Sequence, residues 1–423
     1  MFYNIMKIRK VFIYAEVACW NRQLDATKIQ NYLIKNDYQI VDNPDDADTI
    51  IFVSCAFLKE KLDDSLNKVK EFQKYGAELI VAGCLPITGK DELLRIFNGK
   101  TVGTKDLDKI ENLLPPKNNV RFKDIEDANI LLENEDEKDT IKVVKKIFGK
   151  TDLLKKISTN LTEHILKNLV GENSVEYKFS KKQFHIRIAW GCTGDCSYCT
   201  IKKSAGPFHS KPLEECIKEF KKGLSQGYKN FVLDATDVGA YGIDIESSFP
   251  ELLDNITKIP GDYYIFIREV HPKWIIRYID ELENILKRRK ILILDIAIQS
   301  ANSRILKLMN RPSDIEKMKK TLVRLKKSIP DIAYTCEFII GFPTETEEEF
   351  KQSINFIKEV GLTGGQIYLF SCRRGTEAEK IEPKIPEKEM IKRALCGMKF
   401  LKKAGYTADY ISKEKLLLFN KKS

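Results

Sequence analysis

The first third of the chain alternates short apolar runs with amphipathic segments. Runs of β-branched and aromatic residues at 11–14, 49–54 and 79–83 have the length of strands, and the segments 24–34 and 58–72 carry apolar side chains at helical spacing. Short apolar strands that alternate with helices are typical of a parallel sheet. The pattern therefore predicts an α/β domain over residues 1–115 with a doubly wound parallel sheet.

A second series of apolar runs begins after residue 180. The predicted strands lie near 184–189, 230–233, 263–267, 291–296, 333–340 and 365–370, with helices between them such as 212–226 and 347–360. Six such units are too few to close an eight-stranded barrel. We therefore expect an open partial (β/α)6 barrel over residues 181–376, with its active site at the carboxyl ends of the strands.

The remaining segments are rich in charge. Residues 116–180 contain an acidic run at 133–139 and a helical pattern at 141–169, which indicates a charged linker with covering helices or, alternatively, a recognition element for a partner. Residues 377–423 carry an amphipathic helical pattern at 385–405 and then a Lys-rich stretch. We expect a helical carboxyl-terminal end that finishes in a Lys-rich tail.

Composition and net charge exclude few classes of function. The 71 Lys and Arg residues against 61 Asp and Glu residues give a net charge of +10, which is modest for 423 residues and does not by itself indicate a polyanionic partner. The apolar stretches are too short to span a membrane, and the start of the chain lacks a long apolar signal region. We expect a cytoplasmic protein, whose 10 cysteines are metal ligands or buried thiols rather than disulfides.

Three cysteines after the first barrel strand carry the clearest chemical signal. Cys192, Cys196 and Cys199 have a C-x3-C-x2-C spacing. Such a set holds three irons of a cubane cluster and leaves the fourth iron open, whereas a cluster that only carries electrons normally has four cysteine ligands. A structural zinc site is the alternative, but neither His185 nor His209 stands at a usual zinc spacing from the triad. The spacing therefore favours a catalytic iron–sulfur site.

A second cysteine triad lies in the amino-terminal domain. Cys19, Cys55 and Cys84 each follow one of the three predicted strands. Ligands of parallel sheets gather outside the carboxyl ends of the strands, so the three thiols are expected at one rim. A single one of these cysteines would more often be a buried thiol. Together they indicate a second cluster with its own open iron.

The first triad, with Tyr198 just before its last cysteine, resembles the signature of the radical S-adenosylmethionine enzymes. Over about residues 11–376 the chain is similar to the methylthiotransferases of that superfamily. The matching stretches are Asp25 after Cys19, 81–86, 102–104, 237–242, 299–302, 306–311, 341–346 and 371–376. The residues before Cys19 and Cys55 depart from that family's pattern, as does the run 235–237. The small TRAM β-barrel that follows the radical domain in the family is not expected, because residues 377–423 have a helical pattern.

The resemblance implies a transferase that inserts a methylthio group into an unactivated C–H bond. Its cofactors would be two 4Fe-4S clusters and S-adenosyl-L-methionine. The cluster on Cys192, Cys196 and Cys199 would serve to form a 5′-deoxyadenosyl radical. The cluster on the other triad would hold the sulfur that is transferred, which gives Cys19, Cys55 and Cys84 a catalytic role as well as a metal-binding one. An electron donor such as flavodoxin or ferredoxin is implied as a partner.

Polar and glycine residues at the ends of the barrel strands are the expected cofactor-binding positions. Gln299 and Glu337 are polar residues in apolar strands, and burying either without a partner would cost about 1–3 kcal/mol. A Gly-Phe-Pro turn after a strand allows the backbone to approach a ligand closely, although an ordinary turn explains it equally well. The expected cofactor-binding set is Tyr198, Thr236, Arg268, Gln299, Glu337, Gly341, Phe342 and Pro343.

The substrate is the least determined part of this interpretation. The missing TRAM pattern and the acidic linker favour a peptide or protein over a nucleic acid, because an acidic surface repels phosphates. The alternatives are a tRNA methylthiotransferase that acts on a modified adenosine next to the anticodon, and a radical enzyme whose second cluster only relays electrons. A non-catalytic iron–sulfur scaffold is a further alternative. No membrane partner is expected.

Overall fold

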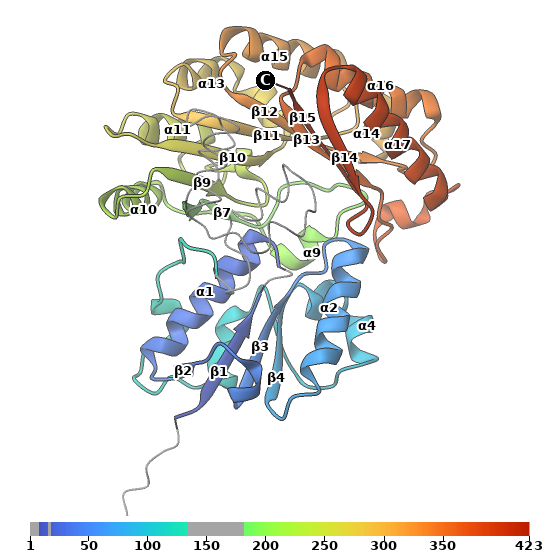
Figure 1. Cartoon of the computed structure of the whole chain (residues 1–423). Coiled ribbons are helices and arrows are strands. Elements are labelled where there is room, and N and C mark those ends of the chain that lie inside the picture. Colours follow the sequence, from blue (N-terminus) through green and yellow to red (C-terminus); the bar gives the residue numbers. More distant parts are fainter. Residues whose placement is uncertain (1–7, 16–17, 133–181, 423) are drawn as a thin grey trace, which may run out of the picture. The chain divides into compact units, whose positions relative to one another are not determined.

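The computed structural model describes residues 8–15, 18–132 and 182–422 (Figure 1). The chain divides into two compact units. The first comprises residues 1–138 together with 203–206, and the second comprises residues 139–202 and 207–423. The acidic run and the helical pattern expected within 133–181 lie outside the described residues.

The amino-terminal unit is built on one parallel sheet with the strand order β2-β1-β3-β4-β5. Its strands are β1 (Lys10–Tyr14), β2 (Gln39–Ile40), β3 (Thr49–Ser54), β4 (Glu78–Gly83) and β5 (Lys100–Gly103). Its helices are α1 (Trp20–Lys35), α2 (Lys59–Phe72), α3 (Leu85–Thr88), α4 (Lys90–Leu94) and α5 (Ile110–Leu113), with short 3-10 turns at Pro44–Asp46, Leu107–Lys109 and Phe122–Asp124.

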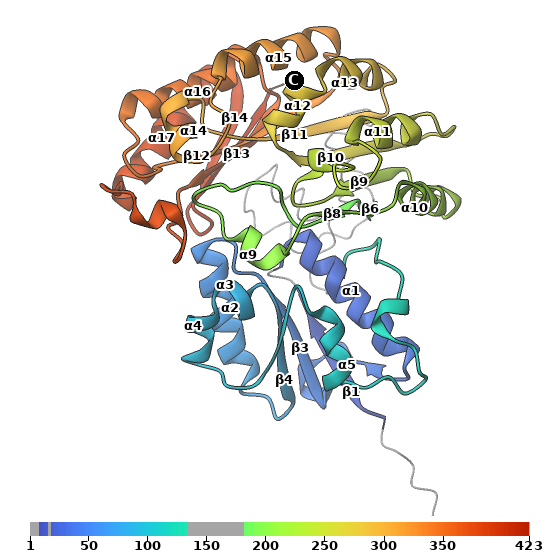
Figure 2. The same cartoon turned by 180° about the vertical axis from the view of Figure 1, so that it is seen from behind.

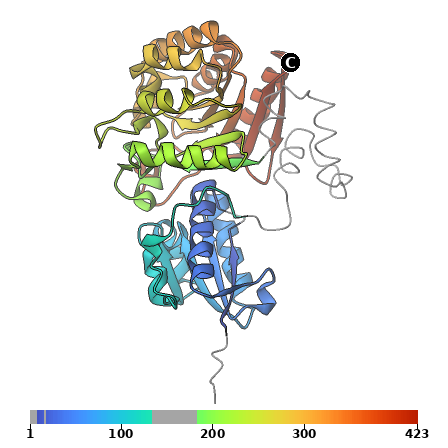
Figure 3. The same cartoon turned by 90° about the vertical axis from the view of Figure 1, so that its left-hand side faces the viewer.

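Helices cover both faces of this sheet because successive strand residues point to opposite sides. In β3, Ile51 and Val53 belong to the core under α1 and α5, whereas Ile50 and Phe52 belong to the core under α2, α3 and α4. Figure 2 shows these two groups of helices on either side of the strands, and α1 is the dark blue helix of Figure 3. The prediction of a doubly wound parallel-sheet domain is confirmed.

The segment that begins the expected linker is part of the amino-terminal core. Phe122, Ile125 and Ala128 are buried, and the Phe122 ring packs edge-on against Tyr32 at 5.7 Å between centroids. The Tyr32 hydroxyl also donates a hydrogen bond to the Leu114 carbonyl at 2.8 Å. Residues 116–132 therefore do not form the solvated linker that the sequence predicted, because these apolar side chains close one face of the sheet.

The carboxyl-terminal unit contains an eight-stranded sheet with the order β14-β15-β13-β12-β11-β10-β9-β6. The parallel strands are β6 (Gln183–Arg187), β9 (Asn230–Asp234), β10 (Tyr264–Val270), β11 (Ile291–Gln299), β12 (Ala333–Ile340) and β13 (Gly364–Leu369). A separate antiparallel pair, β7 (Ala189–Trp190) and β8 (His209–Ser210), flanks the loop that carries Cys192, Cys196 and Cys199. The predicted partial barrel of six βα units is confirmed.

Helices alternate with the barrel strands along the chain. They are α9 (Ile201–Ala205), α10 (Leu213–Ser225), α11 (Phe249–Thr257), α12 (Pro272–Arg277), α13 (Ile279–Leu286), α14 (Ser303–Leu308), α15 (Ile315–Ser328), α16 (Glu347–Val360) and α17 (Glu387–Lys403), with 3-10 turns at Val238–Ala240 and Glu377–Lys380. Local sequence sets the limits of α16: Thr346 and Glu349 form a reciprocal capping box, and Gly361 ends the helix with a left-handed φ of 71°.

The expected Lys-rich tail folds as an antiparallel hairpin. After α17, β14 (Tyr406–Ile411) and β15 (Leu416–Lys421) pair with each other, and β15 pairs with β13. Leu417 and Phe419 are buried, whereas Lys413, Lys421 and Lys422 are exposed. The hairpin covers the edge of β13, which would otherwise present unpaired main-chain groups. Within the described residues, every helix is too short or too polar to cross a bilayer.

The close contact between β3 and β4 predicts a strong effect of a small substitution. A Cβ at Gly83, which has a φ of 97°, would lie 2.4 Å from the Ser54 carbonyl oxygen, whereas nothing lies within 4 Å of a Cβ at Gly76. We expect Gly83→Ala to lower the free energy of unfolding by about 2 kcal/mol or more. Gly76→Ala, the matched control in an exposed turn, should change it by less than about 0.5 kcal/mol. Equal calorimetric unfolding temperatures for the two variants would contradict this packing.

Candidate metal centres

Three cysteines of the amino-terminal unit lie at the carboxyl ends of neighbouring parallel strands. Cys19 follows β1 and begins α1, Cys55 directly follows β3, and Cys84 directly follows β4 and begins α3. The strands β1, β3 and β4 are adjacent in the sheet, so the three thiols share one edge. The Cys55 thiol is buried and hydrogen-bonded to Cys19, the Cys84 thiol is half-buried, and Cys19 is exposed.

An ion pair on α1 lies at this edge. The Arg22 guanidinium forms a buried ion pair with Asp25 at 2.7 Å and interacts electrostatically with all three thiols. The hydrogen bond from Cys55 lowers the pKa of Cys19 to about 6 against the effect of burial, and Arg22 acts in the same direction. The same hydrogen bond and burial raise the pKa of Cys55. The edge therefore favours a thiolate at Cys19, the form that binds metals.

Two buried serines fix the main chain around these cysteines. The Ser65 hydroxyl donates to the Cys55 carbonyl at 2.6 Å and accepts from the Cys55 N–H at 3.3 Å. The Ser54 hydroxyl donates to the Ala82 carbonyl at 2.5 Å and accepts from the Leu85 N–H at 3.2 Å. Ser54, which departs from the resembled family's pattern, thus has a structural role between β3 and β4.

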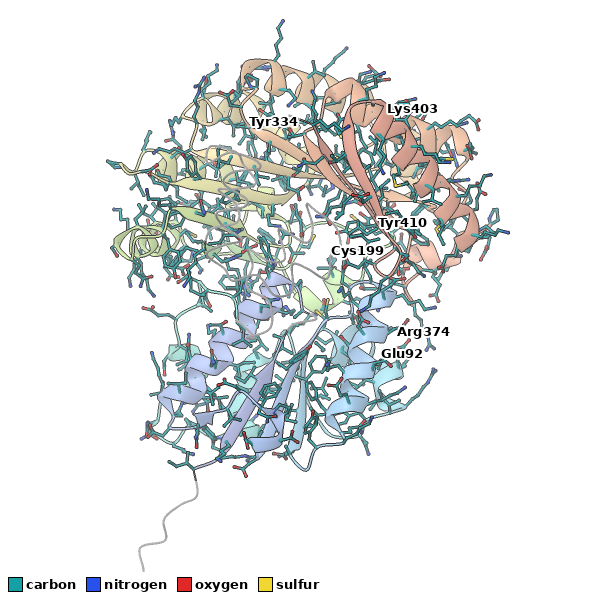
Figure 4. The ribbon with its side chains drawn as sticks, in the orientation of Figure 1. Glu92, Cys199, Tyr334, Arg374, Lys403 and Tyr410 are labelled. Carbon is teal, nitrogen blue, oxygen red and sulfur yellow. The ribbon has the colours of Figure 1, made fainter. Side chains whose placement is uncertain are left out.

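The triad of the barrel lies in the loop between β7 and α9, and Figure 4 labels Cys199. All three thiols are half-buried. Burial raises the pKa of Cys192 to about 11, with help from Asp237, and raises that of Cys199 to about 12. These thiols would stay protonated unless a metal replaced the proton.

Asp237, a residue that was not singled out from the sequence, holds this loop. Its carboxylate accepts hydrogen bonds from the Thr193 hydroxyl and, at 2.8 Å, from the indole N–H of Trp274. The Lys273 ammonium also donates to the Thr193 hydroxyl, at 3.1 Å. Asp237 belongs to the stretch 237–242 that resembles the family. Its contact with Thr193 joins residues far apart in the sequence, so the stretch alone does not reveal it.

Three of the expected cofactor-binding residues join one charged cluster of the barrel. Gln299, with a left-handed φ of 74° at the end of β11, hydrogen-bonds Glu337 of β12. The Arg268 guanidinium pairs with Glu269 at 3.4 Å and lies near Glu337. Burial, followed by the carboxylates of Asp295 and Glu269, raises the pKa of Glu337. We call Arg268, Glu269, Asp295 and Glu337 the barrel charge cluster.

The Gly-Phe-Pro turn has a packing role of its own. A Cβ at Gly341, whose φ is 78°, would lie 2.2 Å from Met390, and the Gly341 N–H donates to Glu345 at 2.7 Å. The Phe342 ring is fully buried and packs edge-on against Tyr198 at 6.5 Å. Pro343 is also buried, and Thr236 is half-buried immediately after β9. The structure thus connects this turn with the cysteine loop through Tyr198.

The donor groups around both triads fit iron–sulfur clusters. Main-chain N–H groups point at cysteine sulfurs: Gly194 donates to Cys192 at 3.3 Å and Ile201 to Cys199 at 3.4 Å. Among the described residues, no three Cys, His, Asp or Glu side chains converge as ligands of a single ion. A cubane does not require that, since each thiolate binds a different iron.

Comparisons with known proteins agree with this geometry. Residues 186–357 match the model described as the Radical SAM superfamily, and residues 11–107 match that described as Uncharacterized protein family UPF0004. The chain is 31% identical over 386 residues to "Ribosomal protein uS12 methylthiotransferase RimO" of Carboxydothermus hydrogenoformans, covering 90% of this chain and 79% of that protein. It is also 31% identical over 381 residues to "tRNA-2-methylthio-N(6)-dimethylallyladenosine synthase" of Clostridium botulinum (strain Okra / Type B1), with coverages of 87% and 76%.

A solved structure shares the fold. The radical S-adenosylmethionine methyltransferase TsrM from Kitasatospora setae aligns with a TM-score of 0.58 at 12% identity, covering 96% of this chain and 81% of that one. At this identity the likeness extends to the fold alone.

The serine that fixes Cys55 allows a test of the amino-terminal site. Ser65→Ala leaves the Cys55 N–H and carbonyl without these buried partners, so we expect the free energy of unfolding to fall by about 1–3 kcal/mol. Iron bound after anaerobic reconstitution should fall as well. Ser225→Ala, which removes an exposed hydroxyl from the end of α10, is the control. Identical iron contents and unfolding temperatures for the two variants would show that Ser65 does not position Cys55.

Proposed function

The chain belongs to the radical S-adenosylmethionine methylthiotransferase family, as its motifs implied, and we propose on this premise that it inserts a methylthio group into an unactivated C–H bond of a protein or peptide. Members of this family are transferases that use S-adenosyl-L-methionine and two 4Fe-4S clusters. The observation that carries the proposal is the presence of two separate cysteine triads, one at the carboxyl ends of three parallel strands and one in the loop that follows β6 and β7 of the barrel.

The two triads would divide the chemistry between them. Cys192, Cys196 and Cys199 would hold one cluster, and the second triad would hold the other. When bound, the clusters and S-adenosyl-L-methionine would supply a 5′-deoxyadenosyl radical and a transferable sulfur. The chain would supply the ligand thiolates, the Arg22–Asp25 ion pair beside the amino-terminal triad, and a barrel that shields the reacting carbon from water.

The remaining members of the expected set would line the cofactor. Tyr198 and Phe342 pack together beside the cysteine loop, and Gln299 presents its amide to Glu337. Thr236, Gly341 and Pro343 lie just after strands of the barrel, the edge at which such barrels bind ligands.

The charge cluster supports a protein substrate over RNA. Arg268 is the one cation among its four members, beside the carboxylates of Glu269 and Asp295, while the raised pKa of Glu337 favours a neutral carboxyl group there. Carboxylates in the barrel would repel nucleotide phosphates. Ribosomal protein uS12, which one relative is named for, is therefore the first substrate to test.

Transfer RNA is the second candidate substrate, because an equally similar relative is named as a tRNA-modifying synthase. We further propose that the enzyme acts in the cytoplasm, whose reducing conditions would keep its ten free cysteines reduced. A flavodoxin or ferredoxin would supply the electron.

Iron analysis tests the two clusters. After anaerobic reconstitution we expect about eight irons per chain, and about four when either triad is replaced by alanine. Cys396→Ala, at an exposed thiol of α17, should leave the count unchanged. About four irons in the unmodified protein would rule out the second cluster.

Product analysis tests the reaction and its substrate. The reduced, reconstituted enzyme should convert uS12 peptide and two S-adenosyl-L-methionine molecules to 5′-deoxyadenosine, methionine, S-adenosylhomocysteine and a peptide in which SCH3 has replaced H, with the sulfur supplied by the second cluster. The products are measured by mass spectrometry. Replacing Cys19, Cys55 and Cys84 by alanine should abolish the methylthio product but not S-adenosyl-L-methionine cleavage. Modification of tRNA alone would reassign the substrate, and cleavage without sulfur transfer to either substrate would favour an electron-relay role for the second cluster.

A further inference from the structure

Each sulfur of the barrel triad accepts an N–H hydrogen bond, and one of these donors is a side chain. Cys192 and Cys199 accept from main-chain groups of the cysteine loop itself. Cys196 accepts from the Arg311 guanidinium, with 3.4 Å between Nη1 and Sγ. Among the described contacts to these sulfurs, the Arg311 donor is the one that carries a charge and can be removed by substitution.

Arg311 is a buried cation with unusual surroundings. Its side chain also donates through Nη2 to the Ala297 carbonyl of β11, and only 8% of the residue is exposed. Within the described residues, no carboxylate forms an ion pair with Arg311, and its Nε has no hydrogen-bond partner. Burial, followed by the charge of Arg311, lowers the pKa of nearby His271 to about 2, so this imidazole is neutral.

A buried guanidinium needs a compensating negative charge. The polar side chains beside Arg311 that favour its charge are those of Cys196 and Tyr198, and Cys196 is the one whose sulfur accepts its hydrogen bond. A cysteine binds iron as a thiolate, so a cluster held at Cys196 would place a negative charge against this guanidinium.

The turn that carries Arg311 is fastened to the cysteine loop. The Ser197 N–H donates to the Met309 carbonyl at 3.1 Å, and the Ser197 hydroxyl donates to the Leu308 carbonyl at 2.7 Å. The Asn310 amide donates to the Asp195 carbonyl at 3.2 Å. These contacts, made by residues over a hundred positions apart, hold the guanidinium at the sulfur.

We propose that Arg311 is a positioning residue that raises the reduction potential of the cluster held by Cys192, Cys196 and Cys199. The inference rests on the proposed function only in assuming that this triad binds a 4Fe-4S cluster. Reduction adds one electron, taken from a low-potential donor of the flavodoxin or ferredoxin class, and forms or breaks no bond. A fixed positive charge and an N–H donor at a ligand sulfur both stabilise the more negative, reduced state.

The test uses the full chain with Cys19, Cys55 and Cys84 replaced by alanine, so that a single cluster is titrated. Arg311→Met removes the charge and the donor, whereas Arg311→Lys keeps the charge. Arg304→Met, at a half-exposed arginine that pairs with Glu349, is the matched control. Each protein is reconstituted, its iron is counted, and its potential is measured by dithionite titration followed by electron paramagnetic resonance without S-adenosyl-L-methionine.

We expect Arg311→Met to retain about four irons and to lower the ratio of reduced to oxidised cluster at least tenfold at a fixed potential, a shift of about 59 mV. Arg311→Lys should shift less, and Arg304→Met should match the parent. If Arg311→Met loses iron, the reduction potential of Arg311→Gln is measured instead. This variant keeps N–H donors but lacks the charge, and it should show a lowered potential in the same direction. An unchanged potential in an iron-loaded Met or Gln variant overturns the inference. A parent protein that binds no iron contradicts the proposed function instead.

Discussion

The common direction of neighbouring parallel strands is the constraint on which the amino-terminal cysteine site depends. Because β1, β3 and β4 run the same way side by side, a cysteine placed just after each strand comes to one edge of the sheet. Gly83 permits the close approach of β4 to Ser54, and the buried Ser65 hydroxyl fixes the main chain of Cys55. In the barrel, all three cysteines lie in one loop that follows β6 and β7. Strand direction thus does for the three amino-terminal cysteines what a single loop does for the barrel triad.

The two triads differ in whether the arginine beside each of them has a carboxylate partner. Beside the amino-terminal triad, Arg22 is paired with Asp25 at 2.7 Å, so the added charge is largely cancelled. Beside the barrel triad, Arg311 has no carboxylate partner among the described residues. A cluster next to an uncompensated cation accepts an electron more readily than one next to an ion pair. This difference gives a physical reason for assigning reduction to the barrel site and sulfur chemistry to the amino-terminal site.

The strands and the positions of the cysteines could be predicted from the sequence, because each is determined by residues that are close together in the chain. The apolar runs that end before Cys55 and Cys84 mark β3 and β4, and the spacing of the barrel triad is visible in eight consecutive residues. The hairpin of β14 and β15 could not be predicted in this way, because the apolar side chains of β14 alternate with polar ones and those of both strands are buried only when the hairpin packs against β13 and α17. Phe122 and Ile125 lie in and just after a single 3-10 turn, which is too short to show a hydrophobic period, so their place in the amino-terminal core was missed. Arg311 and Asp237 act through contacts that are distant in sequence, which no local pattern records.

The central claim is that each triad holds its own cluster and that only the barrel cluster offers an open iron to S-adenosyl-L-methionine. Mössbauer spectroscopy of protein reconstituted with iron-57, before and after addition of S-adenosyl-L-methionine, measures this most directly. We predict that about one iron in eight changes its isomer shift, and that the change persists when Cys19, Cys55 and Cys84 are replaced by alanine. A spectrum that does not respond, or a response that requires the amino-terminal triad, would contradict the account.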